Sequence, residues 1–263
     1  MFSAKNASIV NGAQTAGAIH RVTDKEKLSG AFVQVRLIAL DKCPPDFAKD
    51  VTRATNTQNR VEAKDFASLD PLQERLRTEL LVSGREYLIK AGDKVVDASR
   101  QCTAEEAAFA LSCASDVALA TIAKNSIGRV WDDSPEAGGK GVSIYRKVFP
   151  QSLDSQYLWN TVQALRAVDQ HLQAVKTKVT SGVCVHGNRF VAAQFFKSMD
   201  RSRLFSTNFS VSEVPLAEIK SLVDDVQKVL KTNFKTSYPG ALFKHQAKCQ
   251  EIDERLKELR KQK

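Results

Sequence analysis

Residues 9–19 read IVNGAQTAGAI, a stretch in which an apolar pair runs directly into Asn11-Gly12. Asn-Gly is a strong hairpin signal when strands flank it on both sides. Here only the preceding side is strand-like, because Ala16, Ala18 and their neighbours favour a helix over a strand. The stretch therefore predicts a strand, a tight corner and a helix.

A corner of this kind leaves several backbone N–H groups unpaired at the start of the helix, where a phosphate or another anion binds readily. Gly12 permits close approach of the backbone, and Gln14 and Thr15 add polar side chains. We expect Asn11, Gly12, Gln14 and Thr15 to bind a nucleotide or nucleic acid. A capped corner without a ligand has the same spacing, so both interpretations stay open.

A second polar group follows an expected helix over residues 44–56. The side chains of Asn56, Gln58 and Asn59 are three primary amides within four residues. An amide donates and accepts hydrogen bonds at once, which suits it to reading the edge of a base. The alternative is structural, with Asn56 as the helix C-cap and the other residues in a solvated turn.

Two further segments have strand-like patterns. In FVQVRLIAL (32–40) apolar residues alternate with Gln34 and Arg36, which predicts a half-buried strand. Residues 84–98 predict a short hairpin. Together with the neighbouring helices, these segments predict an α/β domain over residues 1–100, with a small sheet.

Capping patterns mark two helices near the middle of the chain. Asp70 and Gln73 are spaced as the N-cap and the capping-box partner of one helix. Thr103 and Glu106 have the same spacing at the start of a second, Ala-rich helix, which we expect to run to about Lys124.

The rest of the chain predicts an all-helical domain over residues 101–263, so that the protein is mainly α overall. Apolar residues recur at helical spacing over residues 158–175 and again over 219–229. The last segment, 241–263, is a heavily charged helix that we expect either to fray or to pack on a partner.

The positive charge is concentrated at the C-terminal end. The formal net charge is +9, and residues 181–263 hold 15 Lys and Arg against 9 Asp and Glu, whereas residues 101–180 hold 8 of each. Such a balance fits a polyanionic partner. A solvated basic surface that serves solubility is the alternative.

The cysteines do not suggest a metal site or a disulfide framework. They are five in number, scattered and without a C-x-x-C pair, so buried free thiols are expected. The sequence contains no apolar run long enough to span a membrane, and its N-terminus does not resemble a signal peptide. We therefore expect a cytoplasmic protein without membrane contact or bound metal, and the sequence assigns no cofactor.

The order of the segments IVNGAQTAGAI, VQVRLI, VTRATNTQNRV and DFASLDPLQERL resembles the signature of the AIPR family, the abortive-infection phage-resistance proteins of bacteria. The family pattern is similar to I-V-N-G-x-Q-T, a short strand, T-N-x-Q-N-x-V and L-x-S-x-D-x-x-Q. Ser68, Asp70 and Gln73 hold the polar positions of the last element. The resemblance is dense over residues 8–93, and the later YRKVF segment (145–149) is compatible with it.

Family members are usually longer and have a region ahead of the I-V-N-G motif, so the resemblance implies a C-terminal portion or a short variant. The corner is also distantly similar to the D-G-Q-H-R element of DNA phosphorothioation regulators and to the G-x-x-R phosphate-binding corner of ParB-like domains. Thr15 stands where those proteins place His-Arg. Carried over, Gly12, Gln14 and Thr15 would face a phosphate.

The resemblance implies a phage-defence protein that binds nucleotide or nucleic acid at the corner. An enzyme is a second hypothesis, a nuclease or nucleotide hydrolase completed by an upstream region. Its nearest candidates are Asp65, Asp70 and Glu74, although no paired-carboxylate spacing stands out. A third hypothesis is a non-catalytic module that pairs with another defence protein through the C-terminal helix.

Overall fold

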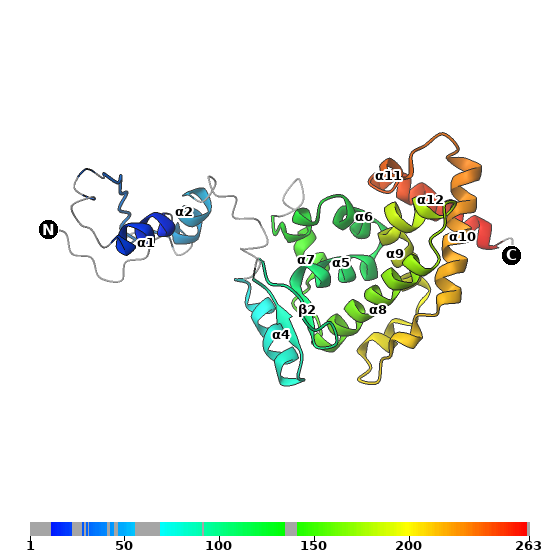
Figure 1. Cartoon of the computed structure of the whole chain (residues 1–263), viewed down its shortest axis with the longest axis horizontal. Helices are drawn as coiled ribbons and strands as arrows, with labels where there is room; N and C mark the ends of the chain where they lie inside the picture. The colour runs from blue at the N-terminus through cyan, green and yellow to red at the C-terminus, as the bar shows by residue number, and fades with distance from the viewer. Residues whose placement is uncertain are drawn as a thin grey trace. The chain divides into compact units, whose positions relative to one another are not determined.

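The structure, a computed structural model, describes residues 12–22, 28, 30, 32–40, 43–44, 47–55, 69–90, 92–134 and 141–261. The chain divides into two compact units, residues 1–62 and 63–263, and each is described by itself (Figure 1). No helix within the described residues is long and apolar enough to cross a membrane. The domain boundary that the sequence places at residue 100 stays a prediction.

The first unit contains the helices α1 (Ala13–Arg21) and α2 (Phe47–Thr55). Because residues 13–21 are helical, the chain after Gly12 does not return as the second strand of a hairpin. The helical half of the predicted corner is therefore confirmed. So is the helix expected over residues 44–56, which begins three residues later than the sequence indicates.

The strand expected over residues 32–40 is wrong. These residues form neither strand nor helix, and Phe32 and Leu37 are 95% and 75% exposed. Alternating apolar residues make a strand only where a neighbouring strand pairs with them and one face is covered. No strand lies in the described part of this unit, so the pattern has nothing to pair with.

The second unit is mainly helical with one small sheet (Figure 1). Its described elements run, in chain order, α4 (Pro71–Val82), β1 (Glu86–Leu88), β2 (Gln101–Thr103), α5 (Ala104–Ser115), α6 (Val117–Asn125), η2 (Ile127–Trp131), α7 (Ile144–Val148), α8 (Ser155–Ala174), η3 (Gly182–His186), α9 (Asn188–Ser198), η4 (Arg201–Phe205), η5 (Val211–Glu213), α10 (Leu216–Asn233), α11 (Pro239–Leu242) and α12 (Gln246–Lys261). The mainly α fold with a small sheet agrees with the class predicted from the sequence.

The sheet is not the hairpin that residues 84–98 suggest. β1 and β2 pair in parallel, with Glu86 opposite Gln101. The Gln101 side chain accepts hydrogen bonds from the amides of Val96 and Asp97, which folds the chain into a tight loop just before β2. This loop reverses the chain once more, so β2 arrives in the same direction as β1.

α5 forms the centre of the helical unit and packs against α6, α8 and α9. Its small residues Ala107, Ala108 and Ala110 are fully buried, which lets the neighbouring helices approach closely. The sequence predicts one helix to about residue 124, but the chain breaks at Asp116, whose backbone is extended. The Asp116 side chain then caps α6 by accepting a 2.7 Å bond from Leu119 N.

The other helical predictions are confirmed, with one correction at the C-terminus. The apolar stripes of residues 158–175 and 219–229 lie in α8 and α10 and are largely buried. The apolar side of the last helix, α12, lies against helices of its own unit, while contact with a partner stays a prediction. The helix packs on α6 and α10 and buries Cys249, Ile252 and Leu256.

Candidate functional site

The corner at Gly12 has the backbone geometry that a helix start requires. Gly12 is the N-cap of α1 with φ 86° and ψ 13°, in the left-handed region that favours glycine. The first helical bond runs from Ala16 N to Gly12 O at 2.9 Å. The amides of residues 13–15 therefore have no acceptor within the helix, and Gly12 has no side chain with which to cap them.

Only part of the predicted binding set lies in the described structure. Thr15 is exposed on the first turn of α1. Asn11, the side chain of Gln14, and Asn56, Gln58 and Asn59 lie outside the described residues. Both groups belong to the unit of residues 1–62, and their juxtaposition stays a prediction.

Asp70 is the N-cap of α4, as the sequence predicts, and it has two further partners. Its Oδ1 accepts a hydrogen bond from Leu72 N at 3.0 Å. Its Oδ2 accepts one from the Tyr145 hydroxyl at 2.9 Å and one from Arg146 Nη1 at 2.6 Å. The carboxylate is only 7% exposed, so these bonds replace most of its hydration.

Gln73 is not the capping-box partner that its spacing suggests. It is 1% exposed and lies between two buried tyrosines. Its Oε1 accepts a 2.7 Å bond from the Tyr87 hydroxyl, and its Nε2 donates a 3.0 Å bond to the Tyr145 hydroxyl. A buried hydroxyl group without a hydrogen-bond partner costs more free energy than an N–H group at the start of a helix that water can reach. The two tyrosine hydroxyls therefore determine the orientation of the Gln73 side chain.

The result is a polar relay, defined here as Tyr87, Gln73, Tyr145 and Asp70 joined in that order. Burial raises the pKa of Tyr87 well above its usual value. Burial also raises the pKa of Tyr145, and the hydrogen bond to Asp70 adds to the effect while the bond from Gln73 opposes it. Both hydroxyls therefore stay protonated near neutral pH, and the hydrogen bonds of the relay join α4, β1 and α7.

Arg146 extends the relay to the segment before α7. Its Nη2 pairs with Asp133 Oδ2 at 3.0 Å, and Ser143, the N-cap of α7, donates a 2.7 Å bond to Asp133 Oδ1. The guanidinium also lies over the Tyr145 ring, 4.8 Å from its centroid. Through these contacts α7 is fixed to the start of α4.

A family model described as AIPR protein matches residues 1–141, more than half of the chain. The chain belongs to the AIPR family. Membership implies a role in abortive-infection phage resistance. No curated protein and no solved structure gives a significant match.

The position of Asp70 and Gln73 relative to the AIPR match shows which parts of the chain the relay connects. Both lie inside the matched region, whereas Tyr145 and Arg146 follow directly after its end at residue 141. The relay therefore joins the family region to the helices beyond it. Sequence reasoning missed the tyrosines and Arg146, although a glutamine on the apolar side of a helix signals a buried partner.

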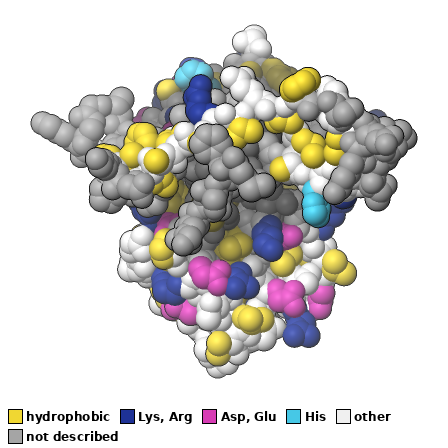
Figure 2. Space-filling view, turned by 90° about the vertical axis from the view of Figure 1, so that its left-hand side faces the viewer, with side chains coloured by type: hydrophobic (Ala, Val, Ile, Leu, Met, Phe, Trp, Pro, Cys, Tyr) yellow, Lys and Arg dark blue, Asp and Glu magenta, His cyan; other side chains and the backbone are white. Residues whose placement is uncertain are grey.

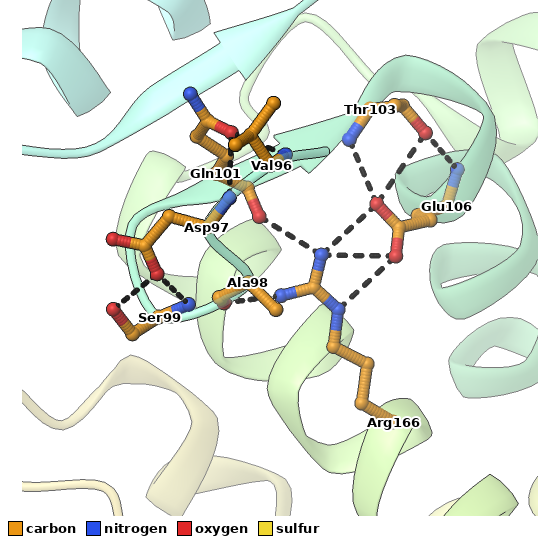
Figure 3. A network of polar contacts seen from close by, with 8 residues as sticks. All are labelled: Val96, Asp97, Ala98, Ser99, Gln101, Thr103, Glu106 and Arg166. Carbon is orange, nitrogen blue, oxygen red and sulfur yellow. Dashed lines mark hydrogen bonds and ion pairs between the residues drawn. The ribbon is translucent and has the colours of Figure 1, made fainter. Parts of the chain in front are cut away.

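Arg166 of α8 makes a second junction, shown in Figure 3. It donates to the carbonyls of Ala98 and Gln101 at 2.6 and 2.8 Å and pairs with Glu106 at 2.9 Å. Glu106 in turn completes the capping box with Thr103, as the sequence predicts. One guanidinium thus holds the loop before β2, the start of α5 and α8 in register.

An open groove of about 290 Å³ lies beside this junction, between α5 and α8. Its apolar lining includes Phe109, Val162 and Leu165. The Arg166–Glu106 pair lies on its rim, and so does Asp169, which receives two bonds from Arg189 at 2.9 and 2.8 Å. Each arginine already faces a carboxylate, so the groove offers an anion little unpaired charge.

Of the three carboxylates considered for catalysis, only Asp70 and Glu74 lie within the described residues. Asp70 is occupied by the relay, Glu74 pairs with Arg77, and Asp65 lies outside the described ranges. Among the residues that the structure describes, no three His, Cys, Asp or Glu side chains are placed to hold a metal.

The cysteines are all free thiols, and four of the five are buried, Cys43 being partly exposed. Burial raises the pKa of Cys102 and of Cys113 to about 12. A thiol with so high a pKa is a poor nucleophile at neutral pH. These two cysteines therefore belong to the core and not to a reactive site.

Proposed function

We propose that this AIPR protein acts in phage defence by binding the phosphate of a nucleotide or nucleic acid at the corner of Asn11, Gly12, Gln14 and Thr15. The observation that supports the proposal most directly is the left-handed Gly12 at the start of α1, an N-cap that has no side chain to bond the first amides of the helix. These N–H groups and the helix dipole attract an anion.

The charges along α1 agree with this direction of binding. No acidic residue stands in the first turn, where a carboxylate would compete with a phosphate, and His20 and Arg21 lie in the last turn. In the proposal, the amides of Asn56, Gln58 and Asn59 face the corner and contact the base of the ligand. A phosphate at the helix start and amides at the base edge together select a nucleotide unit.

A binding assay on the intact chain tests the proposal. AMP, a labelled single strand and a labelled duplex are titrated against wild type and against Gly12→Val and Asn56→Ala. Wild type is expected to bind at least one probe. Gly12→Val is expected to bind about tenfold or more weakly, because a branched residue is strained at a positive φ and blocks the amides.

Gly17→Ala is the matched control, since Gly17 lies within the same helix and has open space where a Cβ would stand. It should bind like wild type. The proposal is wrong if wild type binds no probe, or if Gly12→Val and Asn56→Ala both retain wild-type affinity. In cells challenged with phage, wild-type expression should lower the plating efficiency, and Gly12→Val should lose this protection.

A further inference from the structure

Three cations from separate elements meet around the π-helical turn η3 of the second unit. Lys124 ends α6 and donates a 3.3 Å hydrogen bond from its Nζ to the carbonyl of Val185 in η3. Arg189 stands in the first turn of α9, directly after η3. Lys244 follows α11, a short helix that packs against η3. We call this group the cation cluster.

The turn beneath the cluster is rigid because glycines let two segments pack without side chains between them. A Cβ on Gly187 would come within 2.7 Å of the Phe243 ring, and one on Gly182 within 2.8 Å of Pro239. A Cβ on Gly240 would be 2.5 Å from the Tyr238 ring. Residues 238–243 are therefore held directly against residues 182–187.

An exposed aromatic ring lies against η3, the turn around which the cluster is defined. Tyr238 is 66% exposed, and its hydroxyl lies 3.2 Å from Nε2 of His186 in η3. The two rings meet edge to face with their centroids 5.4 Å apart. The imidazole thus fixes one edge of the tyrosine ring and leaves much of its surface open for stacking.

The cations of the cluster outnumber the acids that face them. Burial lowers the pKa of Lys124, and the charges of Arg189 and Lys244 lower it further, while Asp169 opposes them. Asp169 is already bound by Arg189. Within the described residues, no ion pair joins Lys124 or Lys244 to an acid.

The face drawn in Figure 2 offers a comparison for this excess. In the lower part of the view in Figure 2, basic and acidic side chains lie next to one another. The exposed pairs of α4, Arg75 with Glu79 and Arg77 with Glu74, are of this balanced kind. Holding like charges together costs stability, and a bound anion removes that cost.

We propose that Lys124 and Lys244, with the open face of Tyr238, form a second binding site for a phosphate that carries an unpaired base, while Arg189 stays paired with Asp169. A free nucleotide and a single-stranded nucleic acid both present this chemistry. Single-strand binding combines a basic surface for the backbone with an aromatic ring on which a base stacks. The site lies in the helical unit and does not depend on the corner at Gly12.

The test uses the intact chain and three probes: AMP, a labelled thymidine oligonucleotide of about 12 nucleotides, within the range of single-strand site sizes, and an oligoglutamate peptide. Binding of the oligonucleotide is expected to fall about tenfold or more in Lys244→Glu and in Tyr238→Ala. The salt dependence should also weaken in Lys244→Glu, because each lost phosphate contact lowers the slope of log K against log salt by about 0.7.

Lys220→Glu is the matched control, because Lys220 is an exposed lysine near the start of α10 and undergoes the same change of charge. It should stay within about twofold of wild type. AMP binding that depends on Lys244 and Tyr238 would identify a free nucleotide as the ligand. Oligonucleotide binding without AMP binding would identify a strand.

Three results would overturn the proposal. Wild type binds neither the oligonucleotide nor AMP, or Lys220→Glu loses as much affinity as Lys244→Glu, or oligoglutamate binds as tightly as the oligonucleotide. The last two would mean diffuse charge attraction. If Gly12→Val abolishes binding while Lys244→Glu and Tyr238→Ala leave it intact, the corner proposal stands and this one fails.

Discussion

The polar relay and the cation cluster are both groups of polar side chains drawn from distant parts of the second unit, but their hydrogen bonds and charges are arranged in opposite ways. In the relay, Tyr87, Gln73, Tyr145 and Asp70 satisfy one another, and every hydroxyl hydrogen has an acceptor. In the cation cluster, like charges stand together around an exposed ring. Polar groups that satisfy one another's hydrogen bonds stabilise the fold. Like charges that lack acidic partners repel one another, and a bound anion relieves this repulsion.

The strongest test of this contrast removes the centre of the relay. Gln73→Leu leaves the buried Tyr87 hydroxyl without an acceptor and takes one donor from Tyr145. We expect the free energy of unfolding to fall by about 3 kcal/mol, because a buried polar group without a partner loses its full hydration. Urea unfolding followed by circular dichroism measures the change.

Two further variants distinguish the loss of the relay's hydrogen bonds from other effects of exchanging glutamine for leucine. Gln151→Leu makes the same exchange at an exposed position and should change stability by less than about 0.5 kcal/mol. Adding Tyr87→Phe to Gln73→Leu removes the orphaned hydroxyl and should recover about 1 kcal/mol. Equal stability of Gln73→Leu and wild type would show that the relay does not stabilise the fold.

A smaller effect on the stability of α1 distinguishes Gly12, which has a positive φ at the helix start, from Gly17 within the helix. Gly12→Ala places a Cβ at φ 86° and should destabilise α1 by about 1 kcal/mol. Gly17→Ala, within the helix and with open space around it, should stabilise α1 by about 0.5–1 kcal/mol. Amide hydrogen exchange in residues 16–21 reports both. Shifts of the same sign would contradict the left-handed geometry.

The smallest expected effect is a change of stability with pH at Asp253, an acid that lies between Lys197 and Lys257. This arrangement is the reverse of the cation cluster. Burial by itself would raise the pKa of Asp253, but hydrogen bonds from Lys197, Lys257 and Gln194 outweigh it and lower the pKa below the usual 3.8. A carboxylate with a lowered folded-state pKa stabilises the protein above its unfolded value, and this contribution is lost as the pH falls through the folded value.

Asp253→Asn should therefore reduce the stability modestly at pH 6 and bring it closer to that of wild type as the pH falls below about 4. Urea unfolding at a series of pH values measures the difference between the two proteins. A difference that does not change over this range would mean that the charge of Asp253 contributes nothing to folding.

Local signals predicted much of the helical fold. Asp70 and Thr103 cap helices as their spacing indicates, and the apolar stripes of α8 and α10 are buried. Predictions that required a neighbour failed. The alternating residues 32–40 have no strand to pair with in the described part of their unit. The sequence predicts that the turn near Gly92 joins an antiparallel hairpin, but β1 and β2 are parallel because the loop before β2 reverses the chain again.

The candidate sites depend even more on contacts between distant residues. No local pattern shows that Gln73 meets Tyr145, or that Lys124 lies close to Lys244, because only the packing of the helices brings them together. Gly12, in contrast, could be identified from its neighbours. An Asn-Gly pair before alanines already specifies a positive φ and a helix start.

The position of α12 also affects how the protein can be made. Its buried face covers α6, so the packing of α6 is completed by a helix that is synthesised more than 100 residues later. During translation, α6 emerges before α12, and the apolar residues that α12 covers stay exposed until α12 leaves the ribosome. A chain that stops before residue 246 lacks this cover and would become a substrate for chaperones and proteases.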